Sequence, residues 1–100
     1  ERVLRAEFHN AAEREIADAA AYLENERPYE GTLFLDAFER AITRLLEFPH
    51  AGRLKRRGVR RWVMRHWRYS ILYSVTEYGI FVIALAHQSR RENYWRERVR

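Results

Sequence analysis

The spacing of apolar residues divides this chain into a short leading segment, a helical first half and a β-rich second half. Between positions 10 and 48 the apolar residues recur every three or four positions, which is the period of an amphipathic helix. Beyond position 58 they alternate with polar residues or form unbroken runs, as they do in strands. Residues 2–8 alternate as well, so one short strand is expected before the helices.

Two helices are predicted in the first half. Asn10 and Glu13 have the spacing of a capping box, so we expect the first helix to begin there. It should end near Glu26, because the residue before a proline is disfavoured in a helix. Pro28 suits the first turn of a second helix, and Pro49 should end that helix. The short link predicts an antiparallel hairpin whose apolar stripes pack on a sheet, and the second stripe comprises Phe34, Phe38, Ala41, Leu45 and Phe48.

The second half predicts a loop followed by three strands. Residues 50–58 are basic and rich in turn-forming residues, so we expect the most mobile segment of the chain there. The expected strands cover residues 59–67, 70–76 and 80–86. Because only short links separate them, they should form an antiparallel meander. The last strand is apolar at every position, which is typical of a central strand covered on both faces.

The first of these three strands should border a basic surface. Successive strand residues point to opposite sides of a sheet, so the sequence divides into two sets. Arg61, Val63, Arg65 and Trp67 fall in one set, and Trp62, Met64 and His66 fall in the other. The first set therefore places two cations on a single face.

Composition limits the class of protein. The chain has 100 residues, 47% of them hydrophobic, which suits one domain over residues 1–100 and argues against disorder. Without cysteine it has no disulfides or thiolate metal sites, and its histidines and carboxylates form no metal-ligand spacing. No apolar run reaches the length of a membrane span, and no signal pattern is present. We expect a cytoplasmic protein that uses neither metal nor cofactor and does not enter a membrane.

The charge is distributed unevenly. The net charge is +5, but residues 1–50 carry six arginines against eleven acidic residues, whereas residues 51–100 carry thirteen cations against three acidic residues. Lys55 is the single lysine; all other cations are arginines, whose guanidinium groups pair with oxyanions and stack on aromatic rings. In residues 60–73 and 86–95 these arginines are interleaved with aromatic residues. Such segments indicate a surface that meets RNA, DNA or an acidic protein.

The order of the elements and a set of spaced residues resemble a known family. The residues are Arg60-Arg61, then Tyr69-x-x-x-Tyr73 at the start of a strand, then Ala86-His87-x-x-Arg90-Arg91-x-x-Tyr94-Trp95-x-x-Arg98. Together they are similar to the toxins of the ParE/RelE superfamily of type II toxin–antitoxin systems. The resemblance covers essentially the whole chain and is nearer to the ParE, or plasmid stabilisation, branch.

This resemblance implies an α+β fold. An N-terminal strand and an antiparallel two-helix hairpin would pack with a mainly antiparallel sheet that ends in a three-stranded meander. It also implies a partner, an antitoxin whose acidic and initially disordered C-terminal segment folds against the toxin. The ParE branch is associated with inhibition of DNA gyrase by binding, whereas the RelE branch cleaves mRNA on the ribosome.

This chain carries only some of the residues that RNA cleavage by the RelE branch requires. RNA cleavage by a neighbouring 2′-hydroxyl requires a base, a proton donor and cations on the developing charge. If the protein is a nuclease, the resemblance gives Tyr94, Arg61, Arg65 and His87 as the catalytic candidates. Two further arginine positions of that branch hold Ser70 and Gln88 in this chain. The non-catalytic ParE-like interpretation is therefore preferred, with His87 then a surface or antitoxin contact.

Several side chains are candidates for contact with the target or the antitoxin. They are Arg60, Arg61, Arg65, His87, Arg90, Arg91, Tyr94 and Trp95. Core or sheet-edge packing is the simpler interpretation of each tryptophan, and only an exposed one would anchor a partner or stack on a base. A third functional interpretation is a basic nucleic-acid-binding module without toxicity, whose affinity would fall steeply with salt.

Overall fold

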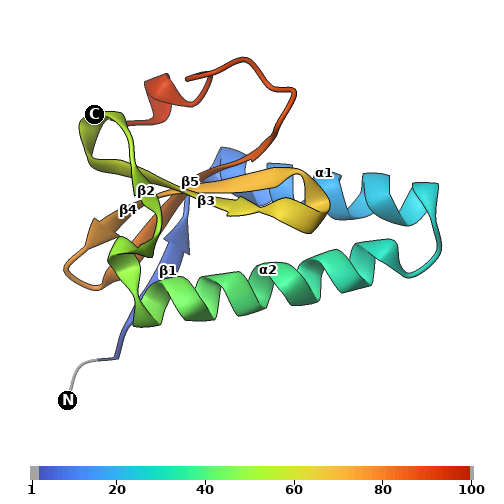
Figure 1. Cartoon of the computed structure of the whole chain (residues 1–100), viewed down its shortest axis with the longest axis horizontal. Coiled ribbons are helices and arrows are strands. Elements are labelled where there is room, and N and C mark those ends of the chain that lie inside the picture. Colours follow the sequence, from blue (N-terminus) through green and yellow to red (C-terminus); the bar gives the residue numbers. More distant parts are fainter. Residues whose placement is uncertain (1–2, 100) are drawn as a thin grey trace.

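The computed structural model describes residues 3–99 and places two helices against one face of a five-stranded sheet (Figure 1). In chain order the elements are β1 (Arg5–Phe8), α1 (Asn10–Glu26), α2 (Glu30–Glu47), β2 (Arg53–Leu54), β3 (Val59–Met64), β4 (Tyr69–Thr76) and β5 (Gly79–His87). The strand order is β1-β5-β4-β3-β2, with β1 parallel to β5 and all other neighbours antiparallel. The predicted α+β fold, with its helix hairpin and C-terminal meander, is confirmed.

The parallel pair at one edge of the sheet sets where β1 begins. Arg5 pairs with Gly79, the first residue of β5, so the residues before Arg5 have no strand partner within the described chain. The predicted strand over residues 2–8 is therefore shorter, and residue 2 lies outside the described part. Gly79 has φ +143°, and a Cβ there would collide with the Arg5 carbonyl oxygen, so this position requires glycine.

The first helix is capped by a histidine. His9 occupies the N-cap position, and its Nδ1 accepts a 3.0 Å hydrogen bond from the Ala11 backbone N–H. The predicted capping box at Asn10 and Glu13 is wrong, because Asn10 is already the first helical residue. The His9 backbone N–H donates to the Val82 carbonyl oxygen at 2.9 Å, so the end of the β1–β5 pairing fixes the helix start.

The second helix begins later than predicted and takes its cap from the first. Pro28 lies in the link and not in the first turn, because α2 starts at Glu30 after Tyr29, whose φ of 70° reverses the chain. The Glu24 carboxylate of α1 accepts hydrogen bonds from the backbone N–H groups of Tyr29 (2.9 Å) and Gly31 (3.0 Å). A carboxylate at this end satisfies free N–H donors and suits the helix dipole.

The strand β3 is shorter than the sequence predicts. It ends at Met64, and Arg65–Trp67 forms a 3₁₀ turn that closes at Arg68 with φ 62°. Trp62 and Met64 share one face as predicted, and that face packs toward the helices, but Arg65, His66 and Trp67 leave the strand. The Trp67 ring lies edge-on to Phe34, with 5.5 Å between centroids, because the tight turn brings it back over the helix-facing core. Arg65 therefore does not share a strand face with Arg61.

The basic loop over residues 50–58 contains a fifth strand that the sequence does not predict. Two 3₁₀ turns, Pro49–Ala51 and Arg56–Gly58, flank β2, whose two residues pair with Arg61 and Arg60 of β3. The Tyr73 hydroxyl donates to the Pro49 carbonyl oxygen at 2.6 Å and accepts from the Gly52 N–H at 2.9 Å. A buried strand residue thus ties this loop to the sheet.

The main core lies between the helices and the sheet. Its fully or nearly fully buried side chains include Ala12, Ala19, Phe34, Phe38, Leu45, Ile71, Tyr73, Ile80, Val82 and Leu85. The predicted stripe of α2 is confirmed except at Phe48, which is 53% exposed. Phe48 lies one residue beyond the end of α2, so the helical period no longer directs it toward the sheet.

The strand β5 contributes side chains to cores on both faces of the sheet and contains a bulge. Leu72 pairs with Ala84 and Tyr73 with Val82, so Ile83 is an extra residue without a partner. Ile83 and Ala84 both join a second core on the face opposite the helices, with Val59, Leu72 and Trp95. The predicted burial of this strand on both faces is confirmed.

Candidate functional site

The chain after β5 returns across the sheet face opposite the helices. We call residues 88–99 the C-terminal arm; Figure 1 shows it arching over the strands and ending in the short 3₁₀ turn Arg96–Arg98. Trp95 of the arm is 4% exposed and packs on Val59, Leu72 and Ile83. Its burial fits the core-packing interpretation, and in this conformation it offers no surface to a partner.

A carboxylate of α1 holds the arm against the edge of β5. The strand β1 pairs with β5 only as far as Val82, so beyond that residue another group must satisfy the β5 backbone. Glu15 Oε1 accepts a 3.0 Å hydrogen bond from the Leu85 N–H. The same carboxylate forms a two-pronged ion pair with Arg98, with Nη1–Oε1 and Nη2–Oε2 distances of 2.9 Å.

Tyr94 belongs to the same network. Its hydroxyl donates a 2.8 Å hydrogen bond to Glu15 Oε2 and lies 3.3 Å from the Leu85 carbonyl oxygen. Arg98 Nη1 also donates to the Ile83 carbonyl oxygen at 3.0 Å. Glu15, Tyr94 and Arg98 therefore close the open edge of β5 with side chains, where a longer β1 would have closed it with backbone.

The network shifts the acidities of its members. Burial raises the pKa of the Tyr94 hydroxyl above its ordinary value, and the neighbouring Glu15 carboxylate raises it further. Burial also acts to raise the pKa of Glu15, but the hydrogen bonds from Arg98, Tyr94 and Leu85 outweigh it and lower that pKa below 4.5. The phenol is thus held neutral beside a charged carboxylate, which is unsuited to a general base at neutral pH.

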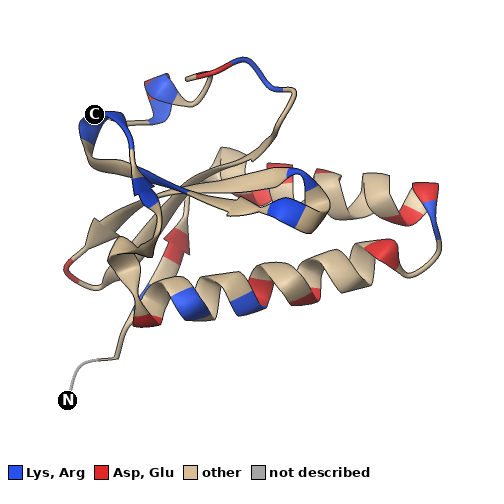
Figure 2. Ribbon diagram, in the orientation of Figure 1, with Lys and Arg blue, Asp and Glu red and all other residues tan. Residues whose placement is uncertain are grey.

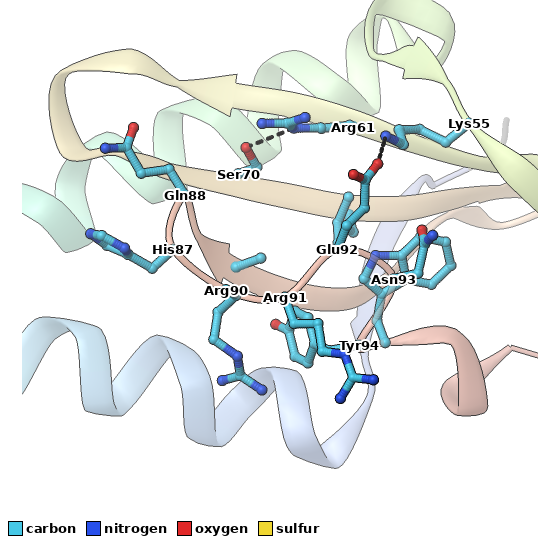
Figure 3. A pocket seen from close by; sticks show the side chains of 13 residues that line it. Lys55, Arg61, Ser70, His87, Gln88, Arg90, Arg91, Glu92, Asn93 and Tyr94 are labelled. Carbon is cyan, nitrogen blue, oxygen red and sulfur yellow. Dashed lines mark hydrogen bonds and ion pairs between the residues drawn. The ribbon is translucent and has the colours of Figure 1, made fainter.

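The arm and the sheet enclose a pocket of about 130 Å³ that collects most of the predicted site residues. We call it the basic pocket; it is lined by Lys55, Arg61, Ser70, Leu72, Ala86, His87, Gln88, Arg90, Arg91, Glu92, Asn93, Tyr94 and Trp95 (Figure 3). Arg61 donates a 3.1 Å hydrogen bond from Nε to Ser70 Oγ. Lys55 forms a 3.2 Å ion pair with Glu92.

Two predicted cations lie outside this pocket. Arg60 points to the opposite side of β3, where Nη1 donates to the carbonyl oxygens of His50 (3.2 Å) and Gly52 (2.8 Å). It therefore fastens the loop before β2 and has a structural role. Arg65 lies in the turn after β3, is exposed, and makes no side-chain hydrogen bond or ion pair with residues 3–99. The four candidate nuclease residues are thus not brought together, because Arg65 is absent from the pocket.

One ring nitrogen of His87 is hydrogen-bonded to Ser89. Its Nδ1 accepts a 3.1 Å hydrogen bond from the Ser89 N–H and lies 2.8 Å from Ser89 Oγ. An Nδ1 that accepts from a backbone N–H carries no proton, so the neutral ring has its proton on Nε2. The ring also packs edge-on against Tyr69, with 5.0 Å between centroids. The lone pair that a base would need is therefore occupied.

The arm presents its arginines outward. Arg90 lies over the Tyr94 ring, 3.8 Å from its centroid, a cation–π contact that fixes the guanidinium through the network beneath it. Figure 3 shows Arg90 and Arg91 pointing away from Arg61 and Lys55, toward α1. Figure 2 shows cations gathered on the arm and the neighbouring strands, while most acidic residues lie on the helices. The described surface is thus divided by charge, as the two halves of the sequence are.

Glu15 and Glu92 of this site were not predicted from the sequence, and Lys55 was expected only as part of the basic loop over residues 50–58. The sequence did contain an indication for Glu15, because this residue lies three positions after Ala12 and four before Ala19, on the buried stripe of α1. An acid on an apolar stripe indicates a buried partner. The pairing of Lys55 with Glu92 had no such signal, since 37 positions separate the two residues and only the fold makes them neighbours.

The described residues include no group of three or more His, Cys, Asp or Glu side chains that could hold a metal ion. Between residues 3 and 99, neither helix has the length and apolar character needed to cross a bilayer.

Comparison with known proteins gives a family and a fold. No curated protein matches this sequence. Among solved structures, a chain described as the chromosomal ParDE TA system from P. aeruginosa superposes with a TM-score of 0.73 at 14% identity, covering 87% of this chain and 98% of that one. At this identity the likeness shows the fold alone. A family model described as ParE toxin of type II toxin-antitoxin system, parDE, matches residues 6–92, and the chain therefore belongs to the ParE toxin family.

Proposed function

We propose that this protein is a cytoplasmic toxin that inhibits DNA gyrase by binding and does not cleave RNA. The observation that carries the non-catalytic part is the Tyr94 hydroxyl, which donates to Glu15 at 2.8 Å and whose pKa is raised. Tyr94 is the candidate that a RelE-like mechanism would use. A phenol held neutral by burial and by an adjacent carboxylate is a poor proton acceptor.

The cations of the pocket support the same conclusion. Ser70 and Gln88 line the pocket at the two positions where the RelE branch carries arginine. Among the described residues that line the pocket, Arg61 is the single guanidinium on the sheet side, and one of its N–H groups is already bonded to Ser70. A developing phosphorane charge would meet few preorganised donors here. The arrangement suits a docking face better than a transition-state site.

A supercoiling assay tests the proposed target. Purified protein added to DNA gyrase and relaxed plasmid should reduce the yield of supercoiled DNA in proportion to its concentration. The matched control is the same protein premixed with its antitoxin, which should restore supercoiling. Undiminished supercoiling at a large excess of correctly folded protein would contradict gyrase as the target.

Primer extension on translated mRNA tests the nuclease alternative. We expect no new 5′ ends after the protein is induced in cells. New ends that disappear with Tyr94→Phe would establish ribosome-dependent cleavage instead. If neither assay responds, growth is unaffected by expression, and duplex DNA binding weakens steeply with salt, the non-toxic binding module is the better description.

Two surfaces of the protein suit the binding of the proposed antitoxin. The basic pocket and the arm suit the acidic residues of its C-terminal segment, and a groove between the helices suits its apolar residues. The apolar lining residues of the groove are Phe8, Ile16, Leu35, Phe38 and Ile42, and Glu13, Glu39 and Thr43 line it as well. Hydrogen exchange should slow on both surfaces when the antitoxin binds, and unchanged exchange at the basic pocket would remove it from the antitoxin interface.

A further inference from the structure

The basic pocket already contains one carboxylate from its own chain. Glu92 Oε2 lies 3.2 Å from Lys55 Nζ, and the two residues come from opposite walls of the pocket, the arm and the segment after β2. The Lys55 side chain is 23% exposed, whereas that of Glu92 is 75% exposed. The lysine is thus largely fixed in the wall, and the carboxylate reaches it from solvent.

The pocket has more positive than negative groups. Among the described residues that line it, Glu92 is the single acid, against Lys55, Arg61, Arg90 and Arg91. Arg61 donates to the neutral Ser70 hydroxyl and makes no ion pair within residues 3–99. Figure 3 shows the Glu92 carboxylate directed at Lys55, on the side of the pocket where Arg61 lies. Positive charge therefore remains uncompensated beside the resident carboxylate.

We propose that the Lys55–Arg61 side of the basic pocket is a binding site for a carboxylate side chain of an acidic peptide, and that Glu92 is its internal competitor. In the free protein Glu92 forms an ion pair with Lys55. An incoming carboxylate replaces Glu92, pairs with Lys55 and also forms an ion pair with Arg61, which has none with the described residues of the free protein. Because an exposed ion pair contributes little net stability, Glu92 is displaced at small cost.

The surroundings favour a peptide carboxylate over a nucleotide phosphate. Nucleic acids bound as single strands usually stack their bases on open aromatic faces. Here Trp95 is 4% exposed, and the Tyr94 ring is covered by Arg90 at 3.8 Å. A pocket of about 130 Å³ admits one side-chain head group, and the group that it holds is a carboxylate.

The test measures how Glu92 affects affinity for an acidic peptide. A short fluorescein-labelled peptide of alternating glutamate and serine is titrated with the full chain at fixed ionic strength, and its anisotropy gives the Kd. Glu92→Gln should lower the Kd roughly two- to fivefold, the range that an exposed ion pair implies. Lys55→Gln should raise it.

Two controls separate competition from net charge. Glu97→Gln removes the same charge from another exposed position of the arm and should lower the Kd by clearly less than Glu92→Gln does. In a Lys55→Gln background, Glu92→Gln should give no more than the Glu97→Gln effect, because the competition needs the lysine. Circular dichroism confirms that every variant is folded.

Three results of these binding measurements would overturn the proposal, and none depends on gyrase. Equal effects of Glu92→Gln and Glu97→Gln, or a Glu92 effect that persists without Lys55, would overturn the internal competitor. A larger gain for a labelled single-stranded RNA than for the peptide would overturn the carboxylate assignment. The proposal rests on the antitoxin contact proposed for the basic pocket and names the residues that make it. Its failure can be told from failure of the gyrase target, since the supercoiling assay can fail while this competition is observed, and the reverse.

Discussion

The Tyr94 hydroxyl donates a 2.8 Å hydrogen bond to Glu15, a residue 79 positions earlier in the chain. This contact joins the C-terminal arm on one face of the sheet to the helix α1 on the other, at the point where β1 no longer pairs with the edge of β5. Because Arg90 stacks on the Tyr94 ring, the bond also fixes a cation of the arm. One carboxylate of the first helix therefore helps to position the basic surface.

Glu15→Gln should destabilise the protein by about 2–3 kcal/mol, below the ~3–5 kcal/mol typical of a fully buried broken pair. The side chains of Glu15 and Arg98 are each 16% exposed, so the substitution leaves a largely buried guanidinium without its counter-charge. Urea unfolding followed by circular dichroism measures the loss. Asp18→Asn, an exposed substitution on the same helix, should change stability by less than about 0.5 kcal/mol. Equal effects of the two substitutions would show that the network adds no stability.

The stability that Glu15 adds should depend on pH in a defined direction. Its pKa in the folded protein is lowered from the ordinary value of 4.5, so the folded state favours the charged carboxylate. The contribution is fully present above pH 4.5 or so and is lost as the pH falls through the lower folded value. The difference in unfolding free energy between the wild type and Glu15→Gln should therefore be constant near neutral pH and shrink in acid. A difference independent of pH would mean that the carboxylate charge is unimportant.

The periodicity of the sequence was enough to predict the layers of this fold. The apolar spacing through Phe34, Phe38 and Leu45 gave the buried face of α2, and the unbroken apolar run through Ile83 gave a strand buried on both sides. Such patterns repeat over several turns or strand residues, so local order alone indicates burial. The class of fold follows from them.

Features made of few residues could not be predicted in the same way. The strand β2 has two residues, too short for any alternation to be recognised. In the sequence, residues 65–67 continue the alternating pattern of β3, so they were predicted as strand. In the structure they form a 3₁₀ turn, and Trp67 packs on Phe34. The candidate site residues Arg61, His87 and Tyr94 came from the resemblance to a known family and from the interleaving of cations with aromatic residues. The Glu15 network depends instead on contacts between distant segments. Long-range polar pairs leave no period in a sequence.

Tyr73→Phe should lower stability by about 1–3 kcal/mol although it removes one oxygen atom. The hydroxyl accepts from the buried Gly52 N–H and donates to the Pro49 carbonyl oxygen, so phenylalanine leaves both groups without this partner. Tyr69→Phe is the matched control, because the Tyr69 hydroxyl makes no side-chain hydrogen bond within residues 3–99. Its effect should stay below about 0.5 kcal/mol. Similar urea midpoints for the two variants would contradict the role of Tyr73 in fastening the loop.

The exposed arginines of the arm should determine inhibition without determining stability. Arg90 and Arg91 lie on the surface of the basic pocket, and neither forms an ion pair within the described chain. Arg90→Gln combined with Arg91→Gln should weaken gyrase inhibition about tenfold, because two charge-assisted contacts of roughly 0.7 kcal/mol each would be lost from the docking face. Urea unfolding should change by less than about 1 kcal/mol, since the cation–π contact of Arg90 with Tyr94 is exposed.

The control for this prediction removes the same charge from the helices. Arg14→Gln combined with Arg40→Gln alters two exposed arginines on α1 and α2, away from the basic pocket. If position matters, inhibition by this variant should match that of the wild type in the supercoiling assay at the same ionic strength. Equal losses from both double substitutions would indicate that net charge alone drives binding, because long-range attraction depends on total charge while a docking face depends on where the charge lies. The comparison therefore decides whether the arm is the surface that contacts the target.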